Sequence, residues 1–132
     1  SQFDGTWDKM YLAARNVQKK REISPLVEAG GVSAAILTEK GNIYVGVCID
    51  TACSLGMCAE RNAIANMITN GEDAIRRVIA VDRNGKAIPP CGAWREFMVQ
   101  LMPDHYHSIQ IMMDYENKKM VTLGDITPNW WI

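Results

Sequence analysis

Apolar residues near the start of the chain recur at the spacing of an α-helix. The segment 6–22 has this pattern, which predicts a first helix, and Asp4 or Thr6 can cap its start. Pro25 and Gly30-Gly31 follow, and they are expected to break the chain before the next element.

Two nearly continuous apolar runs come next, at 32–37 and 43–49. Runs of this length and composition are typical of strands that are covered on both faces. Gly41-Asn42 lies between them and predicts a tight hairpin turn. The two runs are therefore expected to pair as an antiparallel hairpin.

The second half of the chain alternates between helical and strand patterns. The expected elements are, in order, a helix at 58–70, a strand at 78–81, a helix at 92–102, strands at 109–113 and 120–123, and a closing segment at 125–131. This alternation by itself predicts an α/β protein.

Composition narrows the possible partners. A chain of 132 residues with 48% hydrophobic and 22% charged residues is expected to form one domain, spanning residues 1–132. The formal net charge of −1 gives no electrostatic reason to expect nucleic acid as the main partner. No apolar run reaches the length of a membrane span, and no signal peptide is expected at the start. A small, nearly neutral molecule is the natural ligand.

The cysteines indicate a reducing compartment. There are four, and three of them, Cys48, Cys53 and Cys58, lie in one short segment, while Cys91 stands apart. The chain shows no secretory feature, so a metal-binding or catalytic role in the cytoplasm is favoured over two disulfides.

Two cysteines begin predicted helices, in Cys58-Ala59-Glu60 and in the segment from Pro90 to Arg95 that contains Cys91. Backbone N–H groups at a helix N-terminus favour a thiolate. Two thiolates that converge from two helix starts can hold zinc, and a carboxylate such as Glu60 beside them can carry protons.

These two segments resemble the zinc-dependent cytidine deaminase family, whose pattern is Cys- or His-Ala-Glu followed by Pro-Cys-x-x-Cys. The end of the chain, from Leu123 to Trp131, resembles the family's Leu-x-x-Leu-x-Pro-x-aromatic ending. The resemblance implies a three-layer α-β-α sandwich with a five-stranded mixed sheet. It also implies a homotetramer of the small cytidine deaminase or blasticidin-S deaminase type, with Trp131 or its neighbour near another subunit's ribose site.

The resemblance assigns roles to individual residues. Cys58 and Cys91 are the expected zinc ligands, Glu60 is the expected general acid and base, and backbone groups near Ala59 are expected to hold the edge of the base. At the expected sugar-binding side, Asp50 takes the place of a Glu that binds a ribose hydroxyl, and Cys48 takes the place of an Asn. Arg61 and Arg95 are expected to offset the negative charge of the thiolates.

Position 94 departs from the family pattern, because Trp94 stands where the third cysteine ligand is expected. An indole has only an N–H donor and cannot ligate zinc. Zinc can bind weakly through two cysteines with water or a substitute such as Cys53, His105 or His107. It can also be lost, with the indole filling the metal cavity, or Trp94 can be a mutation in an otherwise active enzyme.

The expected function is therefore the hydrolytic deamination of cytidine, deoxycytidine or a related cytosine nucleoside, impaired by the missing ligand, with Zn²⁺ at reduced or lost occupancy. The main alternative is an inactive nucleoside-binding protein with the same fold. A deaminase of bases in RNA or DNA is disfavoured by the near-neutral charge. Nucleoside antibiotics of the blasticidin type compete with free nucleosides as substrates. Trp130 and Trp131 are expected either at a subunit interface or packed on their own domain.

Overall fold

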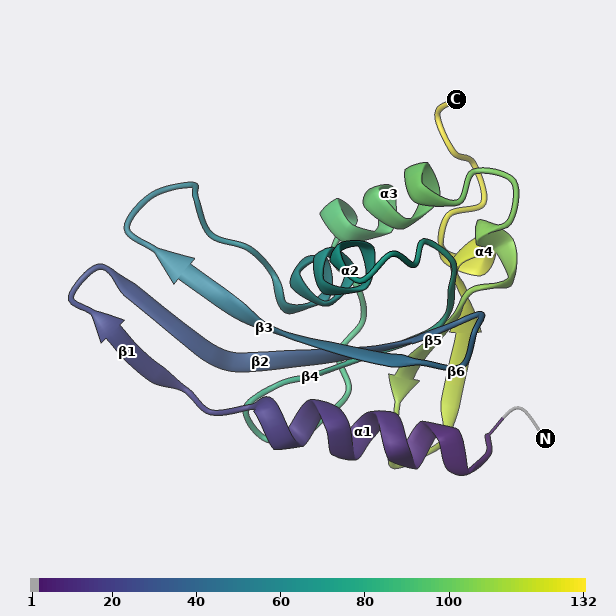
Figure 1. Ribbon diagram of the computed structural model, residues 1–132. Coiled ribbons are helices and arrows are strands. Elements are labelled where there is room, and N and C mark those ends of the chain that lie inside the picture. Colours follow the sequence, from purple (N-terminus) through teal and green to yellow (C-terminus); the bar gives the residue numbers. More distant parts are fainter. Residues whose placement is uncertain (1–2) are drawn as a thin grey trace.

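The computed structural model describes residues 3–132, which form three layers with the sheet in the middle (Figure 1). Helix α1 (Gly5–Val17) covers one face of the sheet. Helices α2 (Ala59–Thr69) and α3 (Gly92–Leu101) cover the other face. Helix α4 (Leu123–Ile126) is short and lies on the same side as α3.

The sheet of the described residues has six strands. They are, in chain order, β1 (Arg21–Ser24), β2 (Val27–Thr38), β3 (Ile43–Thr51), β4 (Ile75–Val81), β5 (Gln110–Asp114) and β6 (Lys119–Thr122). The long strand β2 pairs with β1, β3 and β4, all antiparallel, whereas β4 and β5 run parallel. A mixed sheet between two helical layers confirms the expected α/β sandwich.

The sheet has one strand more than the five expected, because the segment after α1 forms β1. The helix expected at 6–22 ends at Val17, and Gln18 already has extended backbone angles. Just before β1, Lys20 reaches across to Glu28 of β2, with 3.1 Å between Nζ and Oε1. Lys20, which was expected inside the helix at 6–22, therefore lies in the connection between α1 and β1.

Gly30 lies inside β2 and does not break the chain, contrary to expectation. Its φ of +88° falls where the β2–β3 register shifts, between Ala29 and Ser33. A Cβ atom at Gly30 would lie 1.9 Å from the carbonyl oxygen of Lys19, so this irregularity requires glycine. The strand therefore continues on both sides of the irregularity, and Figure 1 shows its N-terminal end, with β1, projecting beyond the helices.

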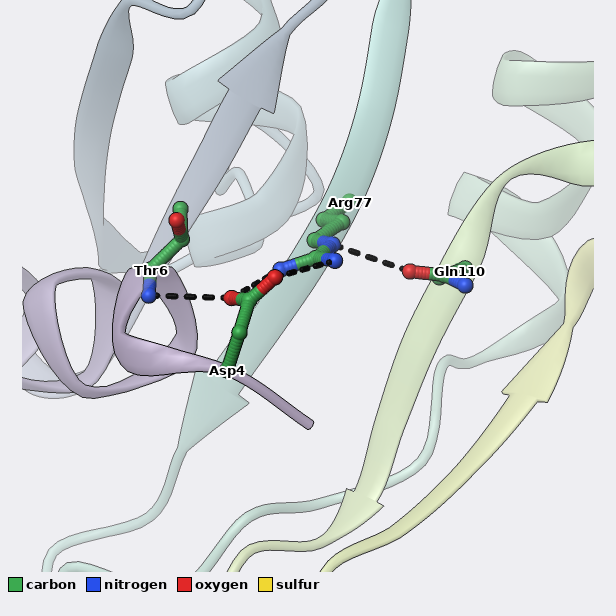
Figure 2. Close-up of polar contacts among 4 residues, drawn as sticks. All are labelled: Asp4, Thr6, Arg77 and Gln110. Carbon is green, nitrogen blue, oxygen red and sulfur yellow. Dashed lines mark hydrogen bonds and ion pairs between the residues drawn. The ribbon is translucent and has the colours of Figure 1, made fainter. Parts of the chain in front are cut away.

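A side-chain network joins α1 to two strands of the sheet (Figure 2). Arg77 of β4 donates to both carboxylate oxygens of Asp4, at 2.8 and 3.1 Å, and to Gln110 Oε1 of β5, at 2.9 Å. Asp4 is also the N-cap of α1, because its carboxylate accepts from the Thr6 N–H at 3.0 Å. The Arg77 guanidinium lies 5.0 Å from the centre of the Trp7 ring, which is fully buried under α1.

The remaining elements lie close to their expected positions. Helix α2 begins after Cys58 and α3 begins after Cys91, so each cysteine is the N-cap of its helix. Strand β4 begins at Ile75, three residues before the expected start. None of the described helices is long and apolar enough to cross a membrane.

Candidate functional site

Six of the eight residues to which the sequence assigns a role at the site line one cavity of about 510 Å³. They come from three separate parts of the fold, which are strand β3, the start of α2 and the loop before α3. They are Cys48, Asp50, Cys58, Ala59, Glu60 and Cys91. A cavity of this volume is in the range that holds a small organic ligand. The structure therefore brings together residues that lie up to 43 positions apart, from 48 to 91.

A loop from 52 to 58 places the start of α2 beside the end of β3. Ile49 and Met57 exchange two backbone hydrogen bonds of 2.9 Å, which close this loop at its base. Gly56 is needed here, because a Cβ atom at this position would lie 2.7 Å from the Ile49 carbonyl oxygen. Cys58 and Asp50 consequently line the same cavity.

The Cys58 thiol is half-buried and has a cationic neighbour. Arg61 Nε donates to Cys58 Sγ at 3.4 Å, and the same guanidinium reaches the Gly56 carbonyl at 3.5 Å. A guanidinium and a helix N-terminus both favour the thiolate form of cysteine. Arg61 therefore lies where the sequence analysis expected it.

Glu60 lies in the first turn of α2, is only 5% exposed and lines the cavity. Burial raises the pKa of its carboxyl group, and this effect is opposed by its own backbone N–H and by the charge of Arg61. Its carboxyl group makes no hydrogen bond to the side chain of another described residue. A buried carboxyl group that faces a cavity is placed to accept protons from a bound molecule and to donate protons to it.

The Cys48 thiol of strand β3 accepts a hydrogen bond from the backbone of the neighbouring strand. The Val32 N–H of β2 donates to Cys48 Sγ at 3.2 Å, and Cys48 Sγ lies 3.9 Å from Asp50 Oδ2. Cys48 is half-buried and Asp50 is exposed. Asp50 therefore presents the more accessible acceptor on this wall of the cavity.

Gln18 is a positioning residue that the sequence analysis did not single out for this role. Its Nε2 group donates to the carbonyls of Gly31 at 2.9 Å and Asp82 at 2.6 Å. Gly31 precedes Val32 of the cavity wall, and Asp82 begins the loop that leads to Cys91. Gln18 thus ties together two segments that both contribute residues to the cavity lining. A polar residue among apolar helix positions was the available signal.

Trp94 is fully buried in the apolar core between the sheet and α2 and α3 and is not among the residues that line the cavity. Its Nε1–H group has no acceptor. Arg95, which was expected to offset the thiolates, donates through Nη1 to the Ile126 carbonyl of α4 at 3.1 Å.

The motifs imply a zinc ion, and the side chains near Cys58 and Cys91 decide whether one fits. No group of three or more His, Cys, Asp and Glu side chains within residues 3–132 is arranged to hold a metal ion. Cys53 lines the cavity but is exposed, and its nearest polar neighbour is Thr51. His105 and His107 lie outside the cavity lining, with His107 stacked on Tyr106. Cys58 and Cys91 alone do not fit a zinc site with three protein ligands.

The end of the chain returns to α3. Trp130 and Trp131 both donate from Nε1 to the carboxylate of Glu96, at 3.1 to 3.3 Å. Trp130 is half-buried and meets Tyr106 edge to face, whereas Trp131 is 74% exposed. One of the two indoles therefore packs on its own domain, and the other remains accessible.

The chain matches no protein-family model. It is 31% identical over 108 residues to blasticidin-S deaminase of Bacillus cereus, covering 74% of each chain. It is 37% identical over 71 residues to a probable cytidine deaminase of Dictyostelium discoideum, covering 52% of this chain and 48% of that one. A cytidine deaminase of Halalkalibacterium halodurans is 34% identical over 73 residues, covering 54% and 55%.

The chain thus spans about half the length of these two cytidine deaminase relatives. The crystal structure of cytidine deaminase from Mycobacterium leprae superposes with a TM-score of 0.77 at 25% identity, covering 96% of this chain and 100% of that one. The likeness therefore extends over nearly the whole fold. By its relation to the Bacillus cereus enzyme and by this shared fold, the chain belongs to the cytidine deaminase family.

Proposed function

We propose that the chain binds a cytosine nucleoside in the cavity at the start of α2 and deaminates it hydrolytically, at a rate that is reduced because Trp94 replaces a zinc ligand. The observation that carries the proposal is the convergence of Glu60 with Cys58 and Cys91 in one cavity of about 510 Å³. Family membership supports deamination as the reaction class.

Glu60 is proposed to move protons from the attacking water to the ring nitrogen and then to the leaving ammonia. Its burial beside the cavity supports this role, because burial raises the pKa of its carboxyl group and so favours the form that carries a proton. Backbone groups near Ala59 are proposed to hold the base. Asp50, with Cys48 beside it, is proposed to bind a sugar hydroxyl.

The cofactor of this family would supply a water molecule with a lowered pKa when bound to three protein ligands. Here only Cys58 and Cys91 are proposed as ligands, and the described residues offer no third. Low zinc occupancy and slow turnover follow from this incomplete set. Cytidine and deoxycytidine are the proposed substrates, with blasticidin-type nucleosides as a related class.

A second candidate function is nucleoside binding without catalysis. The burial of Trp94 in the core favours it, because no metal ligand can come from that position. The two functions share the cavity and differ only in turnover.

The cellular setting and the assembly are proposed from family membership and from two features of the chain. We infer pyrimidine salvage in the cytoplasm, which the four free cysteines support. We also infer a homotetramer, which the exposed Trp131 and Ile132 side chains support.

The test is calorimetric titration with cytidine and deoxycytidine, together with a chromatographic assay for the uracil product. Micromolar to millimolar binding with slow product formation is expected. The Glu60→Gln variant should bind the nucleoside and form no product, because the amide keeps the shape but cannot shuttle protons. If the parent chain and the Glu60→Gln variant both bind the nucleoside and neither forms product, the function is nucleoside binding without catalysis. No binding of either nucleoside would reject both.

A further inference from the structure

Trp94 occupies a special place relative to the two cysteines. It lies in the first turn of α3, three residues after Cys91, and its side chain is completely buried. The same apolar cluster contains Ala59, the first residue of α2, and Cys58 packs against it. The indole therefore belongs to the same core cluster as the first residue of α2, and it comes from the first turn of α3.

In a metalloprotein, the ion would link these two helix starts, and its binding energy would also be folding energy. This chain cannot form that link with three ligands, because no group of three suitable side chains exists within the described residues. The link must come from another source. A buried indole is the largest apolar group that one residue can supply, and burial of such rings dominates the energetics of cores.

We propose that Trp94 has taken over the structural role of the missing metal ligand, so that the chain folds and keeps its cavity assembled without a metal ion. The family requires zinc, but this chain lacks the three donors for it. Stability without the metal ion is then a property of this protein. The indole holds the starts of α2 and α3 by packing on their cluster.

The indole of Trp94 carries a polar group that its apolar surroundings do not satisfy, and this group suggests a specific control. The Trp94 Nε1–H group is buried without an acceptor. Buried donors without partners are rare and cost stability. The Trp94→Phe variant keeps an aromatic ring in the core and removes this donor, so it separates packing from the polar penalty.

The first experiment uses the purified chain as isolated. Zinc content is measured by elemental mass spectrometry, and thermal unfolding is followed with and without EDTA. The expected result is substoichiometric zinc and a melting temperature that the chelator does not change. Stoichiometric zinc whose removal lowers the melting temperature would overturn the proposal.

The second experiment compares Trp94→Cys with Trp94→Phe. Without metal, Trp94→Cys is expected to melt at least about 5 °C lower than the parent, and added zinc should raise its melting temperature in a concentration-dependent way. Trp94→Phe should melt within a few degrees of the parent and show no response to zinc. A Trp94→Cys variant that folds but takes up no zinc would overturn the assignment of position 94. If Trp94→Cys fails to fold, the Trp94→Phe variant and the chelator experiment still test whether the fold is stable without a metal ion.

The proposal uses the cavity described above but fails independently of the proposed function. Cytidine titration of the EDTA-treated chain makes the distinction. A chelator-insensitive fold that does not bind cytidine would reject nucleoside binding and leave the role of Trp94 intact. A fold that loses stability in EDTA would reject the role of Trp94, whatever the nucleoside affinity.

Discussion

A Cβ atom built on Gly46 would lie 2.3 Å from the backbone nitrogen of Ala63, so strand β3 and helix α2 meet with their backbones in direct contact. The Ala59 carbonyl oxygen would be 2.7 Å from the same Cβ atom. Helix α2 carries Glu60 and begins after Cys58, so this close approach sets how far both lie from Cys48 and Asp50 on β3. Glycine is required at position 46 because no side chain fits there, and not because of its backbone conformation, since its φ is not in the left-handed region.

The Gly46→Ala substitution is expected to push α2 away from β3 and to destabilise the fold by about 1–3 kcal/mol, as overpacked cores usually do. It should also weaken cytidine binding, because Glu60 moves with the helix. Denaturant unfolding and calorimetric titration measure the two effects. Gly31→Ala is the matched control, since a Cβ atom there meets nothing within 4 Å, and its change should stay within about 0.5 kcal/mol. Equal stability of the two variants would contradict the packing argument.

Gln18→Ala should loosen the tie between β2 and the loop that leads to Cys91. The substitution removes the Gln18 donor from the Gly31 and Asp82 carbonyls, and the Asp82 carbonyl keeps only the N–H group of Gly85. A loss of about 1–3 kcal/mol in the free energy of unfolding is expected. Gln100→Ala removes an exposed hydrogen bond to Glu96 and should change stability by less than about 0.5 kcal/mol.

The role of Gln18 in positioning has its own readout. The rate at which Cys91 reacts with a disulfide reagent should rise in Gln18→Ala and stay unchanged in Gln100→Ala, measured in the background of Cys48, Cys53 and Cys58 replaced by serine. An unchanged rate in Gln18→Ala, together with lower stability, would reduce Gln18 to a purely structural residue.

Acid should weaken the attachment of α1 to the sheet. The Arg77 guanidinium lowers the pKa of Asp4 from its ordinary value of 3.8 to about 2. A carboxyl group with a lowered pKa in the folded state contributes stability above its unfolded pKa, and this contribution is lost as pH falls through the folded value. The loss should therefore run from about pH 4 to pH 2. Its size should stay below about 1 kcal/mol, because the Asp4 side chain is 46% exposed.

The Asp4→Asn variant makes this pH effect measurable. Its melting temperature should lie below that of the parent at pH 6, and the two should converge toward pH 2. Asn can still cap α1, so the difference reports mainly on the charge of the ion pair. Curves that stay parallel over the whole range would show that Asp4 does not titrate in this window.

Trp131 should contribute to association between copies of the chain. It is 74% exposed at the C-terminal end, next to Ile132, and large apolar groups in such positions favour interfaces. Light scattering at micromolar concentration should give the mass of a tetramer for the parent and a lower mass for Trp131→Ala. Leu12→Ala is a suitable control, because Leu12 is exposed on the opposite layer. A monomer mass for the parent would refute the tetramer.

The order and type of most elements could be predicted from the sequence, because their patterns are local. Apolar spacing marked the helices, and continuous apolar runs marked the paired strands. The N-terminal positions of Cys58 and Cys91 in their helices were predictable for the same reason. Strand β1 was missed, since three of its four residues are exposed and two are charged, and they form a strand only because β2 pairs with them.

The sequence by itself determined the family pattern, the identity of the donors and the absence of the third cysteine, because these are statements about residue types and spacing. Only the tertiary structure decided that the Trp94 side chain is buried in the core and that Glu60 is buried beside the cavity. It also decided that Arg95 donates to a carbonyl of α4 and that Gln18 joins two distant carbonyls. These relationships depend on contacts between segments far apart along the chain, and a periodic pattern carries no information about such contacts.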